Sequence, residues 1–226
     1  ELENDLRATF LLANSRSMPV GEAVAITSEI GRNVRAAAAR TGKNVVVISR
    51  SDSTLRGHYP AEVDALAEAL GQTSAVQIIA PFFLEGGRYT IEDVHYVAEG
   101  DQLIPAGQTE SARDSAFGYR SSNVKEWVEE KTEGRVPASQ VATVSLEDIR
   151  MGGPDRVAKS LVDLGDARVC FPNAASMRDI EVFALGIMRA EAQGARFTYR
   201  SAASFVKARG GLESRPPLTK AELASD

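Results

Sequence analysis

The chain has 226 residues, which is long enough to bury a hydrophobic core without a structural metal or a disulfide. Its formal net charge of −5 at pH 7 argues against a nucleic-acid-binding protein, because such proteins need surplus lysine and arginine to displace counterions from phosphates. A few well-placed arginines can still form a pocket for a small anion. The lone cysteine, Cys170, excludes an intrachain disulfide, and its apolar neighbours predict a core residue rather than a nucleophile.

Short β-branched runs alternate with amphipathic stretches along the chain. The apolar periodicity, with glycine and proline as stops, predicts strands at residues 9–13, 44–48, 75–80, 141–144 and 168–171 and helices at 20–40, 61–70, 123–130, 154–164 and 177–193. Residues 94–97 and 102–104 flank a turn, which predicts a hairpin over one edge of the sheet. Strand–helix alternation of this kind predicts βαβ units. The expected fold class is α/β, with a mainly parallel sheet, flanking helices and an inserted β-hairpin.

No apolar run approaches the length of a membrane span, and no signal peptide opens the chain. Together with the lone cysteine, this predicts a cytoplasmic protein that contacts no membrane. Both ends suggest a piece of a longer protein, because Glu1 is not an initiator methionine and residues 211–226 have the composition of a linker or tail. We expect residues 1–210 to form one α/β domain.

The densest polar cluster is SRSDSTLRGH, residues 49–58. It follows an apolar strand and precedes a helix that begins near Pro60, a residue well tolerated at a helix start. Ligands of open α/β sheets bind in the loops after the carboxyl ends of strands, and the N–H groups of a helix start favour an anion. The position of this cluster therefore predicts an anion-binding site, with His58 as a candidate contact.

The side chains of this loop suit a small hydroxylated acid. Arg50 and Arg56 flank Asp52, and a guanidinium group can bind a carboxylate with two parallel hydrogen bonds. A carboxylate and short hydroxyl groups can pair with the hydroxyls of a polyol. The hydroxyl groups of the loop belong to Ser51, Ser53 and Thr54. An alternative stays open, in which these are ordinary loop and cap residues and Arg56 only pairs with Asp52.

Two further polar loops follow predicted strands. One contains Gly86, Gly87 and Arg88, where the glycines permit close approach of a ligand, although a plain glycine turn explains them equally well. The other contains Ser15 and Arg16. Because the carboxyl ends of parallel strands share one edge of a sheet, the three loops are expected to converge there.

The remaining sequence supplies no metal or nucleotide site. His95 lies between apolar residues and is predicted to be structural, and neither histidine has the neighbours of a metal site. Residues 152–160 resemble a phosphate-binding loop but carry Ala158 where glycine is required. We expect this chain alone to bind neither ATP nor a metal.

Residues 52–57, DSTLRG, resemble the signature of the four-carbon acid sugar kinases. Other segments resemble motifs of this family in the expected order, namely residues 14–16, 80–90, 94–97 and 112–114, and then 173–174, Asp179 and 199–205, which resemble its closing helices. The likeness covers nearly the whole chain. It implies the N-terminal, acid-sugar-binding domain of a two-domain enzyme whose C-terminal domain binds ATP, with residues 211–226 leading toward that second domain.

The resemblance implies that the complete enzyme transfers the γ-phosphoryl group of ATP, with Mg²⁺ assisting, to the terminal hydroxyl of threonate, erythronate or 3-oxo-tetronate. The residues it places in or beside the pocket are Ser15, Arg16, Asp52, Ser53, Thr54, Arg56, Gly57, Gly87 and Arg88. The family's opening aspartate motif, a natural source of the catalytic base, has no counterpart here, so the catalytic residues stay unknown. Ser49-Arg50-Ser51 stands where many relatives carry lysine, so the preferred acid can differ.

The function expected from these observations is the substrate-binding part of an ATP-dependent sugar-acid kinase, inactive on its own. Its expected partner is a small four-carbon sugar acid, and a homodimer is left open. Two alternatives come from other classes of protein: a non-catalytic sugar-acid binding or sensor module, and a protein-interaction or effector role.

Overall fold

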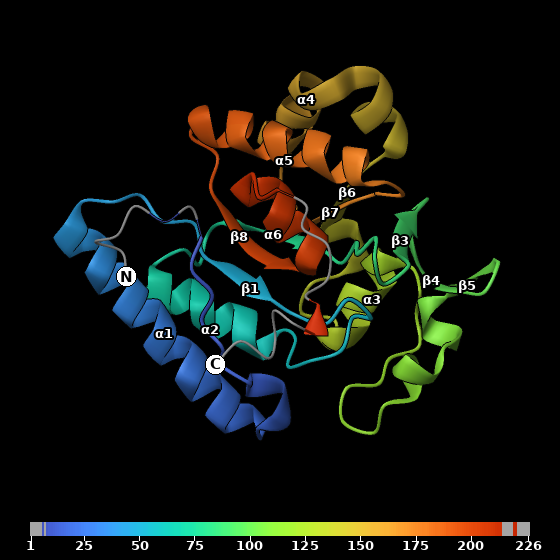
Figure 1. The fold of residues 1–226 in the computed structure, drawn as a ribbon, viewed down its shortest axis with the longest axis horizontal. Coiled ribbons are helices and arrows are strands. Elements are labelled where there is room, and N and C mark those ends of the chain that lie inside the picture. The colour runs from blue at the N-terminus through green and yellow to red at the C-terminus, as the bar shows by residue number, and fades with distance from the viewer. Residues whose placement is uncertain (1–5, 7, 214–218, 221–226) are drawn as a thin grey trace.

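The computed structural model describes residues 6, 8–213 and 219–220, and Figure 1 shows how their elements are arranged. A five-stranded parallel sheet forms the centre, in the order β1-β8-β2-β7-β6. Its strands are β1 (Ile48–Arg50), β2 (Val76–Ala80), β6 (Val141–Val144), β7 (Val169–Pro172) and β8 (Phe197–Ser201). A separate antiparallel sheet consists of β3 (Arg88–Ile91), β4 (Val94–Glu99) and β5 (Gln102–Pro105). The expected fold class is confirmed.

Helices cover both faces of the central sheet (Figure 1). The α-helices are α1 (Val20–Thr41), α2 (Ala61–Leu70), α3 (Val124–Lys131), α4 (Leu146–Val162), α5 (Met177–Ala192) and α6 (Ala203–Gly210). Short 3₁₀ helices are η1 (Ser15–Ser17), η2 (Ala106–Gln108), η3 (Glu110–Arg113) and η4 (Ala138–Gln140). Helices α4, α5 and α6 share one hydrophobic core with the sheet, whereas α2 and α3 share the other, and α1 packs on α2.

The two-residue period of the strands divides the core between these faces. Ile78 of β2 and Cys170 of β7 belong to the cluster under α4, α5 and α6. Their neighbours Ile79 and Phe171 belong to the cluster under α2 and α3. Burial raises the pKa of the Cys170 thiol to about 12, and the side chain is inaccessible. The prediction that Cys170 is a core residue is therefore confirmed.

Several elements lie where the sequence predicts them. The helix expected at residues 61–70 is α2, which ends because Gly71 takes a left-handed conformation with φ 71°. The hairpin is β4–β5, to which the structure adds β3 as a third strand. A bridge between Thr90 and Ala174 attaches this antiparallel sheet beyond the carboxyl end of β7.

The prediction of a strand at residues 9–13 is wrong, and the strand predicted at residues 44–48 is shifted along the sequence. The structure gives residues 9–13 no strand, and the side chains of Phe10 and Leu12 are 69% and 95% exposed. Among the described residues, β1 pairs with β8 only, so residues 9–13 do not add a strand to its open edge. The strand expected at residues 44–48 begins at Ile48 and continues to Arg50, because its pairing with β8 starts there.

Residues 199–205 differ from the helices that the family resemblance implies. Residues 199–201 belong to β8, which lies between β1 and β2, and α6 begins only at Ala203. The helix expected at residues 154–164 begins earlier, at Leu146, and is interrupted at Gly153, which has φ 64°.

The contact between α4 and α5 depends on a glycine. A Cβ atom at Gly186 would lie 2.3 Å from Cγ1 of Val157 and 3.2 Å from the carbonyl oxygen of Pro154. We expect Gly186→Ala to lower the free energy of unfolding by about 1–3 kcal/mol, because the two helices must move apart. Urea denaturation followed by circular dichroism measures this change. Gly21→Ala on α1 is the control, because no described atom lies within 4 Å of the added Cβ. Equal stability of the two variants contradicts the prediction.

Candidate functional site

Residues 51–60 connect the carboxyl end of β1 to α2 and carry the DSTLRG sequence. The backbone N–H of Ser51 donates to the carbonyl of Ser201 at 2.8 Å, which extends the β1–β8 ladder into the loop. The side chain of Leu55 is fully buried in the core under α2 and α3, although its φ of 67° is unusual for leucine. Gly57, with φ 114°, makes the second reversal of the loop. The buried leucine thus fixes the loop, with Thr54 also buried and Asp52 and Arg56 partly exposed.

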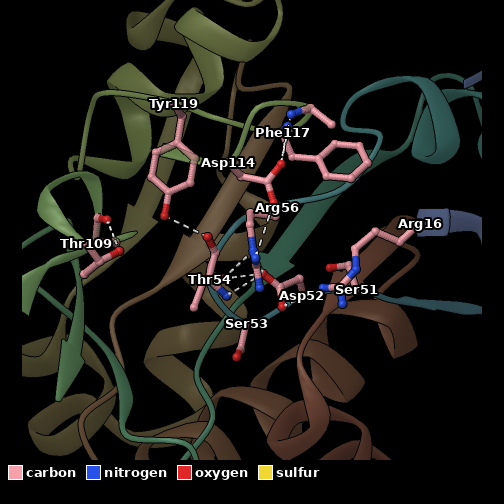
Figure 2. Close-up of polar contacts among 12 residues, drawn as sticks. Arg16, Ser51, Asp52, Ser53, Thr54, Arg56, Thr109, Asp114, Phe117 and Tyr119 are labelled. Atoms are coloured by element: carbon pink, nitrogen blue, oxygen red, sulfur yellow. Dashed lines mark hydrogen bonds and ion pairs between the residues drawn. The ribbon is translucent and has the colours of Figure 1, made fainter. Parts of the chain in front are cut away.

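Asp52 is the centre of the polar contacts in this loop (Figure 2). Its Oδ2 accepts from Nε of Arg56 at 3.0 Å, from the backbone N–H of Thr54 at 3.2 Å and from the Thr54 hydroxyl. Its Oδ1 accepts from Nη1 of Arg16 at 3.1 Å. Burial alone would raise the pKa of Asp52, but the hydrogen bonds from Arg56 and Thr54 and the charges of both arginines outweigh it and lower the pKa. Asp52 is therefore ionised at neutral pH.

A second carboxylate, Asp114, binds the other side of Arg56. Nη1 of Arg56 donates to Oδ2 of Asp114 at 3.4 Å, and Oδ1 of Asp114 accepts from the N–H groups of Ala116 and Phe117. These two N–H groups are the main reason that the pKa of Asp114 is lowered. The Tyr119 hydroxyl donates to the carbonyl of Thr54 at 2.7 Å (Figure 2). The segment after η3 is therefore bound tightly to the DSTLRG loop.

His95 lies beneath the loop and supports it. Its Nε2 lies 2.8 Å from the carbonyl of Ser53, and its Nδ1 lies 3.0 Å from the hydroxyl of Thr90. A carbonyl can only accept, so Nε2 carries the proton and Nδ1 accepts from Thr90. Complete burial lowers the pKa of His95 to about 4, so the ring is neutral at pH 7. The expectation that His95 is structural fits this geometry.

The structure brings the three predicted loops to one region. Nε2 of His58 lies 3.0 Å from the carbonyl of Met18, just after η1, and its ring makes an edge contact with Phe117. Arg88 donates to the carbonyl of Gly86, while its Nε is buried without a hydrogen-bond partner in the described chain. Burial raises the pKa of Tyr119, and the charges of Asp52, Arg56 and Arg88 act on it as well. Arg88 therefore belongs to the same electrostatic cluster.

Other predicted residues lie differently. Arg50 is exposed at the end of β1 and donates to the carbonyl of Ser51, so Arg16 rather than Arg50 is the second arginine on Asp52. Gly87, with φ 67°, closes a turn in which the N–H and carbonyl of Arg88 pair with Phe83. Both interpretations of that glycine pair therefore stay open.

Sequence reasoning gave no role to three further residues of this cluster. Asp114 and Arg200 entered only as members of segments 112–114 and 199–205, which carry the family resemblance, and Tyr119 did not enter. Arg200 donates from β8 to the carbonyl of Arg56 at 2.9 Å. These residues lie far from the loop in sequence, so only the tertiary fold could reveal them.

Two shallow hollows lie away from this loop. One, of about 360 Å³, is lined by Tyr89, Ile91, Leu103 and Ala175 and their neighbours on the antiparallel sheet. The other lies beside α3 and is lined mainly by glutamates. Neither contains the converging arginines and hydroxyl groups of a sugar-acid site. We assign the candidate site to the loop because its arginines, carboxylate and hydroxyl groups have the chemistry of a sugar-acid site.

The described residues include no cluster of three or more His, Cys, Asp and Glu side chains suited to a metal ion. Residues 152–160 lie within α4, where Lys159 pairs with Asp163 at 2.8 Å, so they form no phosphate-binding loop. None of the helices in the described part of the chain is long and apolar enough to cross a membrane.

The fold and the loop together define a class of protein: an α/β domain that presents a charged, hydroxyl-rich loop at the carboxyl end of a parallel strand, where small ligands bind. Residues 1–209 match a family model described as a sugar-binding N-terminal domain, so the chain belongs to that family. The predicted membership of the four-carbon acid sugar kinase family is confirmed.

Named relatives agree with this assignment. The chain is 30% identical over 167 residues to the D-erythronate kinase of Heliobacterium modesticaldum. Its fold is similar to that of a domain of unknown function from Bordetella bronchiseptica, solved with bound citrate as a domain-swapped dimer, with a TM-score of 0.66 and 20% identity over 89% of this chain. A Haemophilus influenzae protein has a TM-score of 0.63 and 18% identity over 88% of this chain. The present chain spans 36% of the kinase, and 44% and 45% of the two solved chains.

The buried histidine makes the stability of the domain depend on pH. The pKa of His95 falls from an ordinary 6.5 to about 4 on folding. The free energy that the neutral ring contributes to folding is therefore complete above pH 6.5 and is lost as the pH falls toward 4. Between pH 7.5 and pH 4, wild-type protein should lose about 3 kcal/mol more unfolding free energy than His95→Gln, which has no titrating group there. Urea denaturation at a series of pH values measures both. Parallel curves for the two proteins would falsify the prediction.

Proposed function

We propose that the complete protein is an ATP-dependent kinase of a four-carbon sugar acid of the threonate, erythronate or 3-oxo-tetronate type, and that this chain binds the acid. The observation that carries the proposal is the ionised Asp52, which two arginines and a hydroxyl hold in the loop after β1. The match to a sugar-binding domain and the similarity to a D-erythronate kinase support it.

The residues of the loop have complementary parts in this proposal. The arginines Arg16, Arg56 and Arg88 donate to the carboxylate of the acid, since a guanidinium group binds a carboxylate with directed, charge-assisted hydrogen bonds. Asp52 accepts hydrogen bonds from the hydroxyls of the sugar, and Ser53 adds a hydroxyl group. The buried Thr54, predicted as a contact, instead holds Asp52 and Arg56 with its hydroxyl. The cluster is fixed before the ligand arrives, which reduces the entropy lost on binding.

ATP and Mg²⁺ belong to this proposal only through the complete protein. ATP supplies the γ-phosphoryl group, and Mg²⁺ offsets its charge. Residues 152–160 are helical, and the described residues include no cluster of three or more side chains suited to a metal ion. We therefore assign only recognition and orientation of the acid to this chain. Three expectations stay predictions: the homodimer, the cytoplasmic location and the linker at residues 211–226. Most residues of that linker lie outside the described part of the chain.

The complete protein should convert a four-carbon sugar acid to its phosphate. Incubation with Mg-ATP and a panel of D-erythronate, D-threonate and 3-oxo-tetronate, followed by mass spectrometry, identifies the product. Arg56→Ala should lower kcat/KM by about a hundredfold, because two charge-assisted hydrogen bonds are removed from the site. Asp52→Asn should also be strongly impaired, because it removes the ionised acceptor.

Arg178→Ala is the matched control, since Arg178 is an exposed residue of α5 that pairs only with Glu181 in the described chain. Its activity should equal that of the wild type. If the folded wild-type protein binds the acid and ATP but forms no phosphate ester, the kinase proposal is wrong and a non-catalytic binding module takes its place.

A further inference from the structure

Arg200 is a charged residue in the middle of the central sheet. It lies on β8, opposite Ser49 of β1 on one side and Ile79 of β2 on the other. Its side chain is 3% exposed. Arginine is almost never buried to this extent unless it is paired with an acid, because removing its charge from water is costly. The partners of this guanidinium group therefore need an explanation.

The guanidinium group lies between aromatic rings and the main chain of the candidate site. Its carbon atom lies 5.3 Å from the centre of the Tyr59 ring and 5.6 Å from that of Trp127, and the two rings stack on each other. Its Nη2 donates to the carbonyl of Arg56 at 2.9 Å and lies 3.7 Å from where a Cβ atom of Gly57 would stand. Arg200 thus holds the backbone of Arg56 from the core side.

No carboxylate among the described residues neutralises Arg200. The charges of two carboxylates, Glu62 and Asp52, act on Arg200, but Asp52 is bound by Arg16 and Arg56, and Glu62 forms no ion pair with Arg200. Arg88 likewise forms no ion pair within the described chain. Burial lowers the pKa of Arg200, yet a guanidinium group stays protonated in a protein. Around the site, the arginines Arg16, Arg56, Arg88 and Arg200 therefore outnumber the carboxylates Asp52, Glu62 and Asp114. The charge of Arg200 is buried beneath the site, where screening by water is weak.

We propose that Arg200 is a specificity-determining residue of the sugar-acid site: its unpaired charge beneath Arg56 and Gly57 favours an anionic ligand over a neutral polyol of the same shape. This inference rests on the proposed function and adds to it the selection of the acid by charge. The aromatic rings stabilise the cation without neutralising it, because a ring contributes a quadrupole and no net charge. A carboxylate partner in their place would cancel the field that the ligand experiences.

The test compares one ligand in two charge states. Isothermal titration calorimetry of the complete protein, without ATP, measures the affinities for D-erythronate and for its primary amide, which keeps the hydroxyls and lacks the charge. In Arg200→Met the preference for the acid should fall by about tenfold, the effect expected of one poorly screened charge. Arg200→Lys should keep most of the preference. Arg196→Met, which removes an exposed arginine just before β8, is the matched control and should keep all of it.

The outcomes separate this inference from the proposed function. If wild-type protein binds the acid and folded Arg200→Met keeps the full preference, the inference is overturned and the proposed function stands. If wild-type protein binds no sugar acid, both fall. Far-UV circular dichroism reports whether each variant is folded.

A measurement on wild-type protein replaces the methionine variant if that variant does not fold. The Nε–H resonance of Arg200, assigned by its loss in Arg200→Lys, should shift when D-erythronate is added and not when the amide is added. An equal shift with both ligands, or no shift with either while the backbone amides of residues 52–57 respond, overturns the inference.

Discussion

The geometry of the charged loop depends on the burial of one apolar side chain. Leu55 lies fully inside the core under α2 and α3, although its backbone has the left-handed φ of 67° that leucine adopts only when its surroundings require it. Contacts with the core fix Leu55, which lies between the oppositely charged residues Asp52 and Arg56. The chain must therefore reverse, and the reversal returns Arg56 to Asp52 at 3.0 Å. Hydrophobic burial stabilises the loop, and the ion pair follows from it.

The polar contacts of the loop serve ligand recognition more than stability. Arg16 is 56% exposed, and an ion pair of this kind contributes about 0–1 kcal/mol to folding. The same contact fixes the orientation of an ionised carboxylate before any ligand arrives, which lowers the entropic cost of binding. His95 acts in the same direction, because its neutral ring hydrogen-bonds the carbonyl of Ser53 and holds the loop from below. The arrangement is rigid on the protein side and open on the solvent side.

Local signals in the sequence predicted much of the fold and part of the site. Helix α2 was predictable because its periodicity and its stop at Gly71 are local, and the DSTLRG loop was predictable from its place between a strand and a helix. The alternative that Arg56 only pairs with Asp52 stays open, since the pair exists but Arg56 also binds Asp114. Arg50 is adjacent in sequence, yet Arg16 pairs with Asp52 instead, because the fold sets this partner. Strand β8 alternates Phe197 and Tyr199 with polar residues, but it is only five residues long and carries a charge, so its sequence alone did not identify it as a central strand.

The position of β8 constrains how the domain can be made. It is the last strand in the described part of the chain, yet it lies between β1 and β2, and its pairing with β1 joins residues roughly 150 positions apart. During synthesis, β1 and β2 are made before β8, the strand that lies between them. Until β8 is made, their edges are open to pairing with other chains. A nascent chain that stops before residue 197 lacks β8 and α6, so β1 has no partner that joins it to the sheet of β2, β7 and β6. The DSTLRG loop, whose first hydrogen bond is to Ser201, can therefore form only at the end of the process.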